Sequence, residues 1–403
     1  MSRLRVRTEA RLTSAGEVIA RGPDGRVMFV EGAAPEETVI VEVQEVRKKL
    51  LKARVLEVEA AGSSRVDPAC TVFGVCGGCA LQHIDYAEQA RLKHRAVLDT
   101  MARLGGIDLA RVCVEDGWFS HAYGVRARVR WWAQTSSVGY RARKSHALVV
   151  APDCPILEQP LQEALRRMPS ELQPDPAPAT GEDIWGVTDG AQVLFHRRHA
   201  SSRAAAGRGA GSLPWGDAES AVAVRDREGI RWVSVGGFGQ AHLAGNDAML
   251  EAMDDWLPDL SVAADLYAGS GNWTRLLARR MPERLVAVEH NRGALALIRR
   301  VLPEVELWPE PVERAVFRLE RWASKRPLVA VVNPPRTGLA EPVCEGLIEC
   351  RPRWLGYVSC NAATLARDAR RLMEGGMRLR RLRTFDLYPQ TPHMEVAACF
   401  EWG

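Results

Sequence analysis

The fold of the C-terminal half is indicated by one short stretch, Asp265-Leu-Tyr-Ala-Gly269-Ser-Gly271-Asn272. It ends an apolar strand predicted over residues 262–266 and opens a helix. Further apolar segments predict strands over residues 285–288, 328–332 and 355–358. Between the first two of these, apolar side chains recur with the spacing of one helical face, at Ala294, Leu297, Ile298 and Val301. Alternating strands and helices predict an α/β domain with a doubly wound parallel sheet over residues 240–403.

The glycines of this stretch predict a site for a nucleotide-like ligand. They let such a ligand approach the backbone, and Glu289, at the end of the next strand, is placed to hold ribose hydroxyls. A dinucleotide fingerprint requires a third glycine where Thr274 stands. The pattern therefore favours S-adenosylmethionine, which has no pyrophosphate, over NAD. An ordinary tight turn is the alternative.

Three later segments carry further candidates. Asn333 begins Asn333-Pro-Pro-Arg336 at a strand's carboxyl end, where open parallel sheets bind ligands. Cys360 stands at the tip of the next strand, before a helix whose N-terminus can stabilise a thiolate. Most lone cysteines are inert and buried, which is the alternative. Glu395, before the last strand, is a candidate base, although taken alone it reads as a solvated surface acid.

Cysteines upstream indicate a metal centre. Cys70, Cys76 and Cys79 form a C-x5-C-x2-C triplet among glycines, and Cys154 precedes Pro155 far downstream. A triplet with a distant fourth thiol favours an iron-sulfur cluster, because zinc ribbons usually contain two C-x2-C knuckles. An all-cysteine zinc site and disulfides remain alternatives.

The N-terminal half divides into two predicted domains. Residues 1–62 alternate as five short strands with a basic loop (Arg47, Lys48, Lys49, Lys52), typical of a small barrel that binds nucleic acid; a solvated hairpin tip is the alternative. Residues 63–239 form a central β-rich domain, whose helix over residues 86–104 is expected to pack on the domain over residues 240–403. Arg128 and Arg130 share one strand face there, as RNA-binding side chains do, or as an ordinary exposed face does.

Composition is compatible with a nucleic-acid partner. The net charge is +4, and 48 of the 54 basic residues are arginine, which pairs with phosphate and stacks on bases. A GC-rich genome explains the same bias. No signal segment or membrane span is visible, which predicts a cytoplasmic protein with reduced cysteines and no membrane contact. No obligate protein partner is expected, and a monomer is the default.

These segments together resemble the bacterial RNA 5-methyluridine methyltransferases along nearly the whole chain. Residues 1–60 are similar to the family's TRAM barrel, and Cys76-Gly-Gly-Cys79 to the family's cluster segment. Val138-Gly-Tyr-Arg-Ala-Arg-Lys144 resembles its central sheet, and the stretches around Gly269, Asn333, Cys360 and Glu395 follow its methyltransferase motifs in order. The resemblance implies a Rossmann-like class I methyltransferase domain.

The resemblance also implies a role for each candidate residue. Cys360 is the nucleophile that adds to carbon 6 of uracil, and Glu395 accepts the carbon-5 proton. The S-adenosylmethionine site is formed by Gln240, Tyr267, Asn272, Glu289 and Asn333. A [4Fe-4S] cluster is held by Cys70, Cys76, Cys79 and Cys154.

Substrate and activity leave alternatives open. The expected substrate is RNA, with 23S rRNA favoured over tRNA. Asn333 stands where the family usually has Asp, and Gln240-Ala-His242 stands where it has Q-x-N. The first departure keeps a third reading open, an RNA-binding or RNA-folding protein whose catalytic domain has decayed. The intact Cys360, Glu395 and Glu289 argue against that reading.

Overall fold

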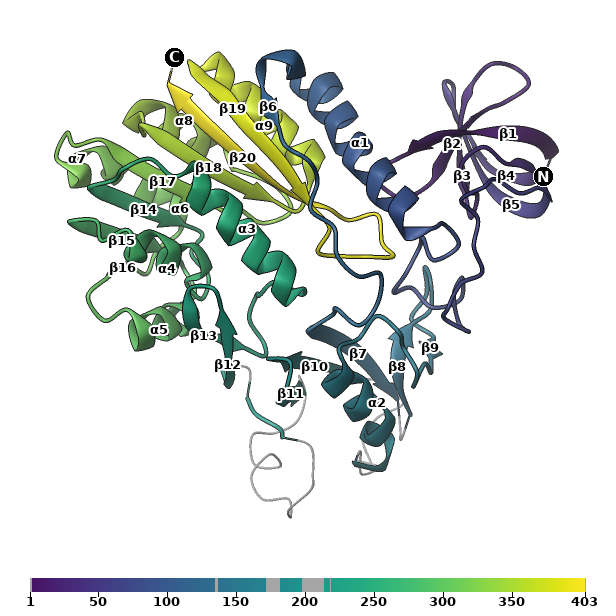
Figure 1. The fold of residues 1–403 in the computed structure, drawn as a ribbon, viewed down its shortest axis with the longest axis horizontal. Helices are drawn as coiled ribbons and strands as arrows, with labels where there is room; N and C mark the ends of the chain where they lie inside the picture. The colour runs from purple at the N-terminus through teal and green to yellow at the C-terminus, as the bar shows by residue number, and fades with distance from the viewer. Residues whose placement is uncertain (1, 135–136, 172–181, 198–213, 218, 403) are drawn as a thin grey trace.

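A computed structural model gives the fold of residues 2–134, 137–171, 182–197, 214–217 and 219–402 (Figure 1). It has three parts: an N-terminal barrel, a central sheet and a C-terminal domain built on a second, larger sheet. Within these described residues, no helix combines the length and apolarity that a membrane crossing requires.

The barrel confirms the prediction of five short strands that bend into one closed sheet. It is closed in the order β1-β2-β3-β5-β4. The strands are β1 (Arg3–Leu12), β2 (Val18–Arg21), β3 (Val27–Glu31), β4 (Thr38–Val46) and β5 (Leu50–Ala60). Alternate side chains point inward, and Val18, Met28, Val30 and Val39 are fully buried there.

The C-terminal domain is an eight-stranded sheet of order β16-β15-β14-β17-β18-β20-β19-β6. The strands are β14 (Val262–Leu266), β15 (Arg284–Val288), β16 (Glu306–Trp308), β17 (Leu328–Val332), β18 (Trp354–Ser359), β19 (Met377–Phe385), β20 (Glu395–Trp402) and β6 (Cys113–Val114). The helices are α3 (Leu243–Trp256), α4 (Asn272–Arg279), α5 (Arg292–Val301), α6 (Val312–Ala315), η2 (Val316–Arg318), α7 (Leu319–Ala323), α8 (Glu341–Cys350) and α9 (Ala362–Glu374). β14, β17 and β18 are buried along their length because helices cover both faces, and they are apolar apart from Asp265, Tyr357 and Ser359.

The expectation of a wholly parallel sheet is wrong at one end. β16, β15, β14, β17 and β18 pair in parallel, but β20 pairs antiparallel with both β18 and β19. No helix separates β19 from β20, so the chain reverses through a loop at residues 386–394 and the two strands must be antiparallel neighbours. We call residues 386–394 the catalytic loop because the candidate base Glu395 follows it directly.

Residues from the middle of the chain complete this domain. The helix α1 (Tyr86–Gly105) begins at Asp85, whose side chain accepts from the backbone N–H of Ala87 and Glu88, and it ends before Gly106 in the left-handed conformation. α1 packs against α9, and after the short helix η1 (Leu109–Arg111) strand β6 pairs in parallel with β19. In Figure 1, α1 lies between the large sheet and the barrel.

The central sheet has the order β11-β10-β7-β8-β9. Its strands are β7 (Arg128–Gln134), β8 (Ser137–Arg141), β9 (Leu148–Val149), β10 (Glu182–Thr188) and β11 (Val193–Arg197), and α2 (Gln159–Glu171) packs on it. Trp131, Leu161 and Phe195 lie in the core between them. A hairpin of β12 (Ala221–Asp226) and β13 (Gly229–Ser234) follows, and β13 packs on α5 of the C-terminal domain.

Candidate active site

The carboxyl ends of several strands meet at one edge of the large sheet. β14, β17 and β18 end there. Because β20 is antiparallel to both β18 and β19, β19 runs in the same direction as β18 and also ends at this edge. The catalytic loop and Glu395, the first residue of β20, are thereby placed beside Cys360, which follows β18.

A cavity of about 1010 Å³ opens at this edge. All seven residues predicted for cofactor binding and catalysis line it, namely Gln240, Tyr267, Asn272, Glu289, Asn333, Cys360 and Glu395. They come from six separate segments of the chain, so only the folded sheet brings them together. A cavity of this size can hold a nucleoside-sized ligand together with a second ring.

The turn after β14 brings backbone close to the cavity. Gly269 and Gly271 have φ values of +54° and +87°, a conformation that favours glycine. A Cβ atom on Gly271 would lie 2.8 Å from Cγ1 of Ile298. The N–H of Gly269 donates to Oε2 of Glu289 at 3.1 Å, which fixes one carboxylate oxygen at the cavity wall. The backbone of this turn therefore holds the Glu289 carboxylate in place.

Thr274 has a structural reason to replace a third glycine. Its hydroxyl is buried and donates to Oδ2 of Asp265 at 2.5 Å. Burial raises the pKa of Asp265 to about 7, and the hydroxyl opposes that rise. Thr274 thus provides a partner for a buried acid at the base of the turn.

Two buried amide oxygens at the cavity have no hydrogen-bond partner in the part of the chain that the structure describes. Oε1 of Gln240 and Oδ1 of Asn272 accept no hydrogen bond from the described residues. The amide nitrogen of Asn272 donates to Oδ1 of Asn246 at 2.8 Å, which directs its oxygen away from Asn246. Buried acceptors without donors are unfavourable, so this wall is suited to a ligand that carries N–H groups.

Gln240 lies on a loop between β13 and α3 that is held at both ends. His242, which replaces the family's asparagine, accepts from the N–H of Gly245 through Nδ1 at 3.2 Å and caps α3. Burial lowers the pKa of His242 to about 4, so the ring is a neutral acceptor. The departure from the family's pattern at position 242 preserves a helix cap.

Cys360 and Glu395 line the same cavity, and the charge of Glu395 acts on the Cys360 thiol. Burial raises the pKa of the Cys360 thiol, the negative charge of Glu395 raises it further, and Arg336 opposes both. Burial of the thiol therefore opposes any stabilisation of the thiolate by the helix that follows it. Glu395 is not a solvated surface acid either: it is 1% exposed, and burial raises its pKa to about 7.

Three cavity residues lacked a sequence-based role. Arg336 lowers the pKa of both Cys360 and Glu395 by its charge, and Tyr388 and His393 line the cavity from the catalytic loop. Arg336 could have been found, since it stands three residues after Asn333 at the same strand end. Nothing in the local sequence distinguishes Tyr388 from an ordinary loop aromatic.

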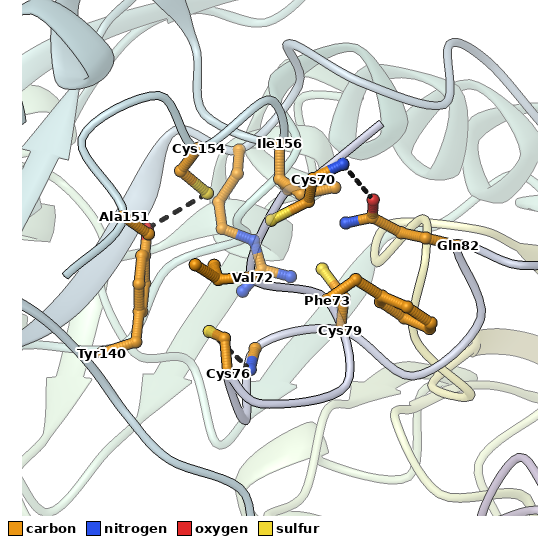
Figure 2. A pocket seen from close by; sticks show the side chains of 12 residues that line it. Cys70, Val72, Phe73, Cys76, Cys79, Gln82, Tyr140, Ala151, Cys154 and Ile156 are labelled. Carbon is orange, nitrogen blue, oxygen red and sulfur yellow. Dashed lines mark hydrogen bonds between the residues drawn. The ribbon is translucent and has the colours of Figure 1, made fainter. Parts of the chain in front are cut away.

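The four predicted cluster cysteines line a second, smaller cavity (Figure 2). Figure 2 shows the sulfur atoms of Cys70, Cys76, Cys79 and Cys154 facing one shared space. The N–H of Gly78 donates to Sγ of Cys76 at 3.3 Å, and the hydroxyl of Tyr140 donates to Sγ of Cys154 at 3.5 Å. Across the described ranges, no three His, Cys, Asp or Glu side chains are arranged to hold a metal ion.

The two arginines predicted to share an RNA-facing strand surface have different roles. The guanidinium of Arg128 donates to the carbonyls of Ser234, Val235 and Gly237, so its predicted role in RNA contact is not supported. Arg130 is half-exposed, pairs with Asp183 and covers the ring of Trp185 at 4.8 Å. Arg128 instead holds the loop that leads to Gln240.

Comparison with known proteins defines the class. The family model for the TRAM domain matches residues 2–56, and the model for tRNA (Uracil-5-)-methyltransferase matches residues 313–401. The crystal structure of Pyrococcus abyssi tRNA (uracil-54, C5)-methyltransferase in complex with S-adenosyl-L-homocysteine has a TM-score of 0.74 and 20% identity, covering 98% of this chain and 99% of that one. The protein is an S-adenosylmethionine-dependent methyltransferase with a TRAM domain.

Relatives that match nearly the whole chain show which family of methyltransferases it belongs to. The 23S rRNA (uracil(1939)-C(5))-methyltransferase RlmD of Halomonas elongata is 33% identical, covering 97% of this chain and 88% of the relative. The enzyme of the same name from Pseudomonas putida is 32% identical, covering 94% and 90%. The chain belongs to the family of RNA uracil-C5 methyltransferases.

Proposed function

We propose that this protein transfers a methyl group from S-adenosylmethionine to carbon 5 of a uridine in 23S rRNA, through a covalent bond between Cys360 and carbon 6. One observation carries the proposal: Cys360 and Glu395 line the same cavity as all five cofactor candidates. The same arrangement argues against a decayed enzyme that only binds RNA, since such a protein has no need to keep a thiol and a base together.

The cavity suits S-adenosylmethionine. The unpartnered oxygens of Gln240 and Asn272 can accept from its ammonium group, and Glu289 can accept from ribose hydroxyls at the neighbouring strand end. Tyr267 and Asn333 complete the lining. When bound, S-adenosylmethionine supplies an electrophilic methyl group on a sulfonium.

Cys360 provides the activation that uracil lacks. Carbon 5 of uracil is too weak a nucleophile to attack the sulfonium methyl group unaided. When the Cys360 thiolate bonds to carbon 6, the ring electrons become available at carbon 5. Carbon 5 then takes the methyl group as its bond to the sulfonium breaks, and S-adenosylhomocysteine is the leaving group. Arg336 favours this step because its charge stabilises the thiolate form.

Glu395 completes the reaction by removing a proton. After transfer, carbon 5 carries both the methyl group and a hydrogen, and the Cys360–carbon 6 bond breaks only as that proton leaves. Oε1 of Glu395 has no partner among the described residues, and a pKa of about 7 allows the carboxylate to accept a proton near neutral pH. The elimination returns the Cys360 thiolate, the 5-methylated base and a protonated Glu395.

The four cysteines suit a [4Fe-4S] cluster better than zinc. A zinc ion needs thiolates that converge at about 2.3 Å on one point. A four-iron cluster binds each thiolate at a different iron, so its ligands surround a larger core. The sulfur atoms face a shared space but do not converge as ligands of a single ion. Donation from Gly78 N–H to Cys76 supports a thiolate at that position.

The RNA substrate is inferred from the relatives and from exposed cations. Relatives at 32–33% identity over nearly the whole chain are named for 23S rRNA, which favours 23S rRNA over tRNA. Lys48 and Lys49 are exposed at the tip between β4 and β5, where phosphates can dock. A stacked uridine has to leave its stack to reach Cys360, at a cost of roughly a few kcal/mol.

The test combines two variants with two RNA substrates. Wild-type protein is expected to transfer labelled methyl to 23S rRNA and not to tRNA. Cys360→Ala should abolish transfer, and Glu395→Gln should accumulate a protein–RNA adduct that survives denaturation. Cys113→Ala, at an exposed thiol, is the matched control and should behave as wild type. Methylation of tRNA instead would overturn the substrate, and full activity of Cys360→Ala would overturn the mechanism.

A further inference from the structure

The cysteine cavity and the catalytic loop are in direct contact. Ala80 and Leu81 follow Cys79, and their backbone N–H groups donate to the carbonyl of Gln390 at 2.9 and 3.1 Å. Gln390 is the middle of the catalytic loop and has φ of +66°. The segment that carries three of the cysteines therefore supports the loop that leads to Glu395.

Arg126 joins the same two regions through its side chain. Its N–H donates to the carbonyl of Ile156 at 3.0 Å, and its carbonyl accepts from the N–H of Glu158 at 3.1 Å, so its backbone is fixed to the segment that follows Cys154. Its side chain lines the cysteine cavity, and its guanidinium carbon lies 5.8 Å from the ring centroid of Tyr388.

Tyr388 belongs to the wall of the active-site cavity. It lines that cavity together with Cys360 and Glu395, and its carbonyl accepts from Lys93. Arg126 does not line the active-site cavity, so it approaches the Tyr388 ring from outside it. One cation thus contacts the walls of both cavities.

The charges explain why an arginine suits this position. Four thiolates around a cluster form an anionic group, and a guanidinium beside them is attracted to it while its planar face remains free to cover an aromatic ring. Arg126 lines the same cavity as Cys79 and Cys154. An uncharged side chain would be attracted neither to the thiolates nor, as a cation is, to the face of the ring.

We propose that Arg126 is a positioning residue that couples the cysteine cavity to the active site: held by the anionic cysteine centre, it fixes the ring of Tyr388 and with it the catalytic loop. This inference rests on the proposed function. It gives the cysteine centre a role in ordering the loop that carries the substrate-facing wall and leads to Glu395.

The test measures order in the catalytic loop directly. Hydrogen exchange of the peptide spanning residues 386–395 is followed by mass spectrometry, alongside visible absorbance of the cluster. Arg126→Gln should keep the absorbance and raise exchange in this peptide about three- to tenfold. Arg126→Lys, which keeps a cation, should restore most of the protection. Tyr388→Leu should match Arg126→Gln, whereas Tyr388→Phe, which keeps the ring, should match wild type.

Kinetics separate positioning from binding. Arg126→Gln is expected to lower kcat with an unchanged KM for S-adenosylmethionine, and the double variant Arg126→Gln/Tyr388→Leu should be no worse than either single variant. Unchanged exchange in Arg126→Gln, or loss of the cluster absorbance in that variant, would overturn the inference. Because exchange is read without RNA or methyl transfer, that failure is distinct from a failure of the chemistry assigned to Cys360.

Discussion

Lys93 of α1 donates through Nζ to Oδ1 of Asp386 at 2.7 Å, in an ion pair whose side chains are 2% and 0% exposed. Asp386 is the first residue of the catalytic loop, and its other carboxylate oxygen accepts from the hydroxyl of Tyr86 at 3.3 Å. Gln89, on the same helix, donates to Oε1 of Gln390 at 2.9 Å. A helix nearly 300 residues upstream therefore anchors the loop that leads to Glu395.

Replacing Lys93 should destabilise the protein strongly. Lys93→Met leaves the Asp386 charge buried without its cation, which costs about 3–5 kcal/mol. Urea unfolding measures the change, and activity should fall with it because the loop loses an anchor. The matched control is Arg91→Met on the exposed side of α1, where Arg91 pairs with Glu88 and the change should stay below about 1 kcal/mol. Equal losses in the two variants would contradict a special role for the buried pair.

Glu395 should reduce stability at neutral and alkaline pH. Burial raises its pKa from 4.5 to about 7, so the folded state favours the protonated acid. Stability is therefore lost as pH rises from about 4.5 to about 7, by roughly 3 kcal/mol in total. Glu395→Gln removes this loss and should unfold at a higher temperature than wild type at pH 8, with a gap that narrows at pH 5. A gap that is the same at both pH values would exclude this electrostatic origin.

Arg336 should control the reactivity of the Cys360 thiol. Arg336→Gln removes the cation that opposes burial, so the pKa of Cys360 should rise and alkylation by iodoacetamide at pH 8 should slow about threefold or more. Glu395→Gln removes the nearby negative charge and should have the opposite effect. The rate is read from the Cys360 peptide by mass spectrometry, with Arg370→Gln on the exposed side of α9 as control. Equal rates in all four proteins would mean that these charges do not act on the thiol.

The sequence predicted local features better than long-range ones. Strands β14 and β17 lie at the predicted residues, because a short apolar run between two helical segments is read as a buried strand. The antiparallel pairing of β20 depends on strand order, which no local period encodes. The burial of Glu395 was missed for the same reason. Glu395 begins β20, which lies between β18 and β19, and this place inside the sheet cannot be read from the residues next to Glu395. Arg128 was assigned to an exposed surface because the alternation of side chains along a strand predicts which face a residue is on. It does not predict that the loop after β13 covers that face.

Alanine should have different effects at Gly269 and Gly271, the two glycines of the turn after β14: one variant should mainly lose stability and the other should mainly lose ligand affinity. A Cβ on Gly271 would meet Ile298 at 2.8 Å, whereas a Cβ on Gly269 would have no atom of the described residues within 4 Å. Both positions have positive φ, so each alanine costs roughly 1–2 kcal/mol in backbone strain. Gly271→Ala adds a clash in the core and should lower the unfolding temperature more, an effect that Ile298→Val should partly relieve.

Gly269→Ala instead places a methyl group where the cavity is open. Gly269 lines the cavity and donates to Glu289, so the added group should compete with S-adenosylmethionine for space. Calorimetric titration with S-adenosylmethionine should show a Kd raised about tenfold or more for Gly269→Ala at a smaller loss of stability. Because both variants place alanine at a positive φ, comparing them helps to separate core packing from ligand contact. If Gly269→Ala binds S-adenosylmethionine as wild type does, the ligand does not approach the backbone at this turn.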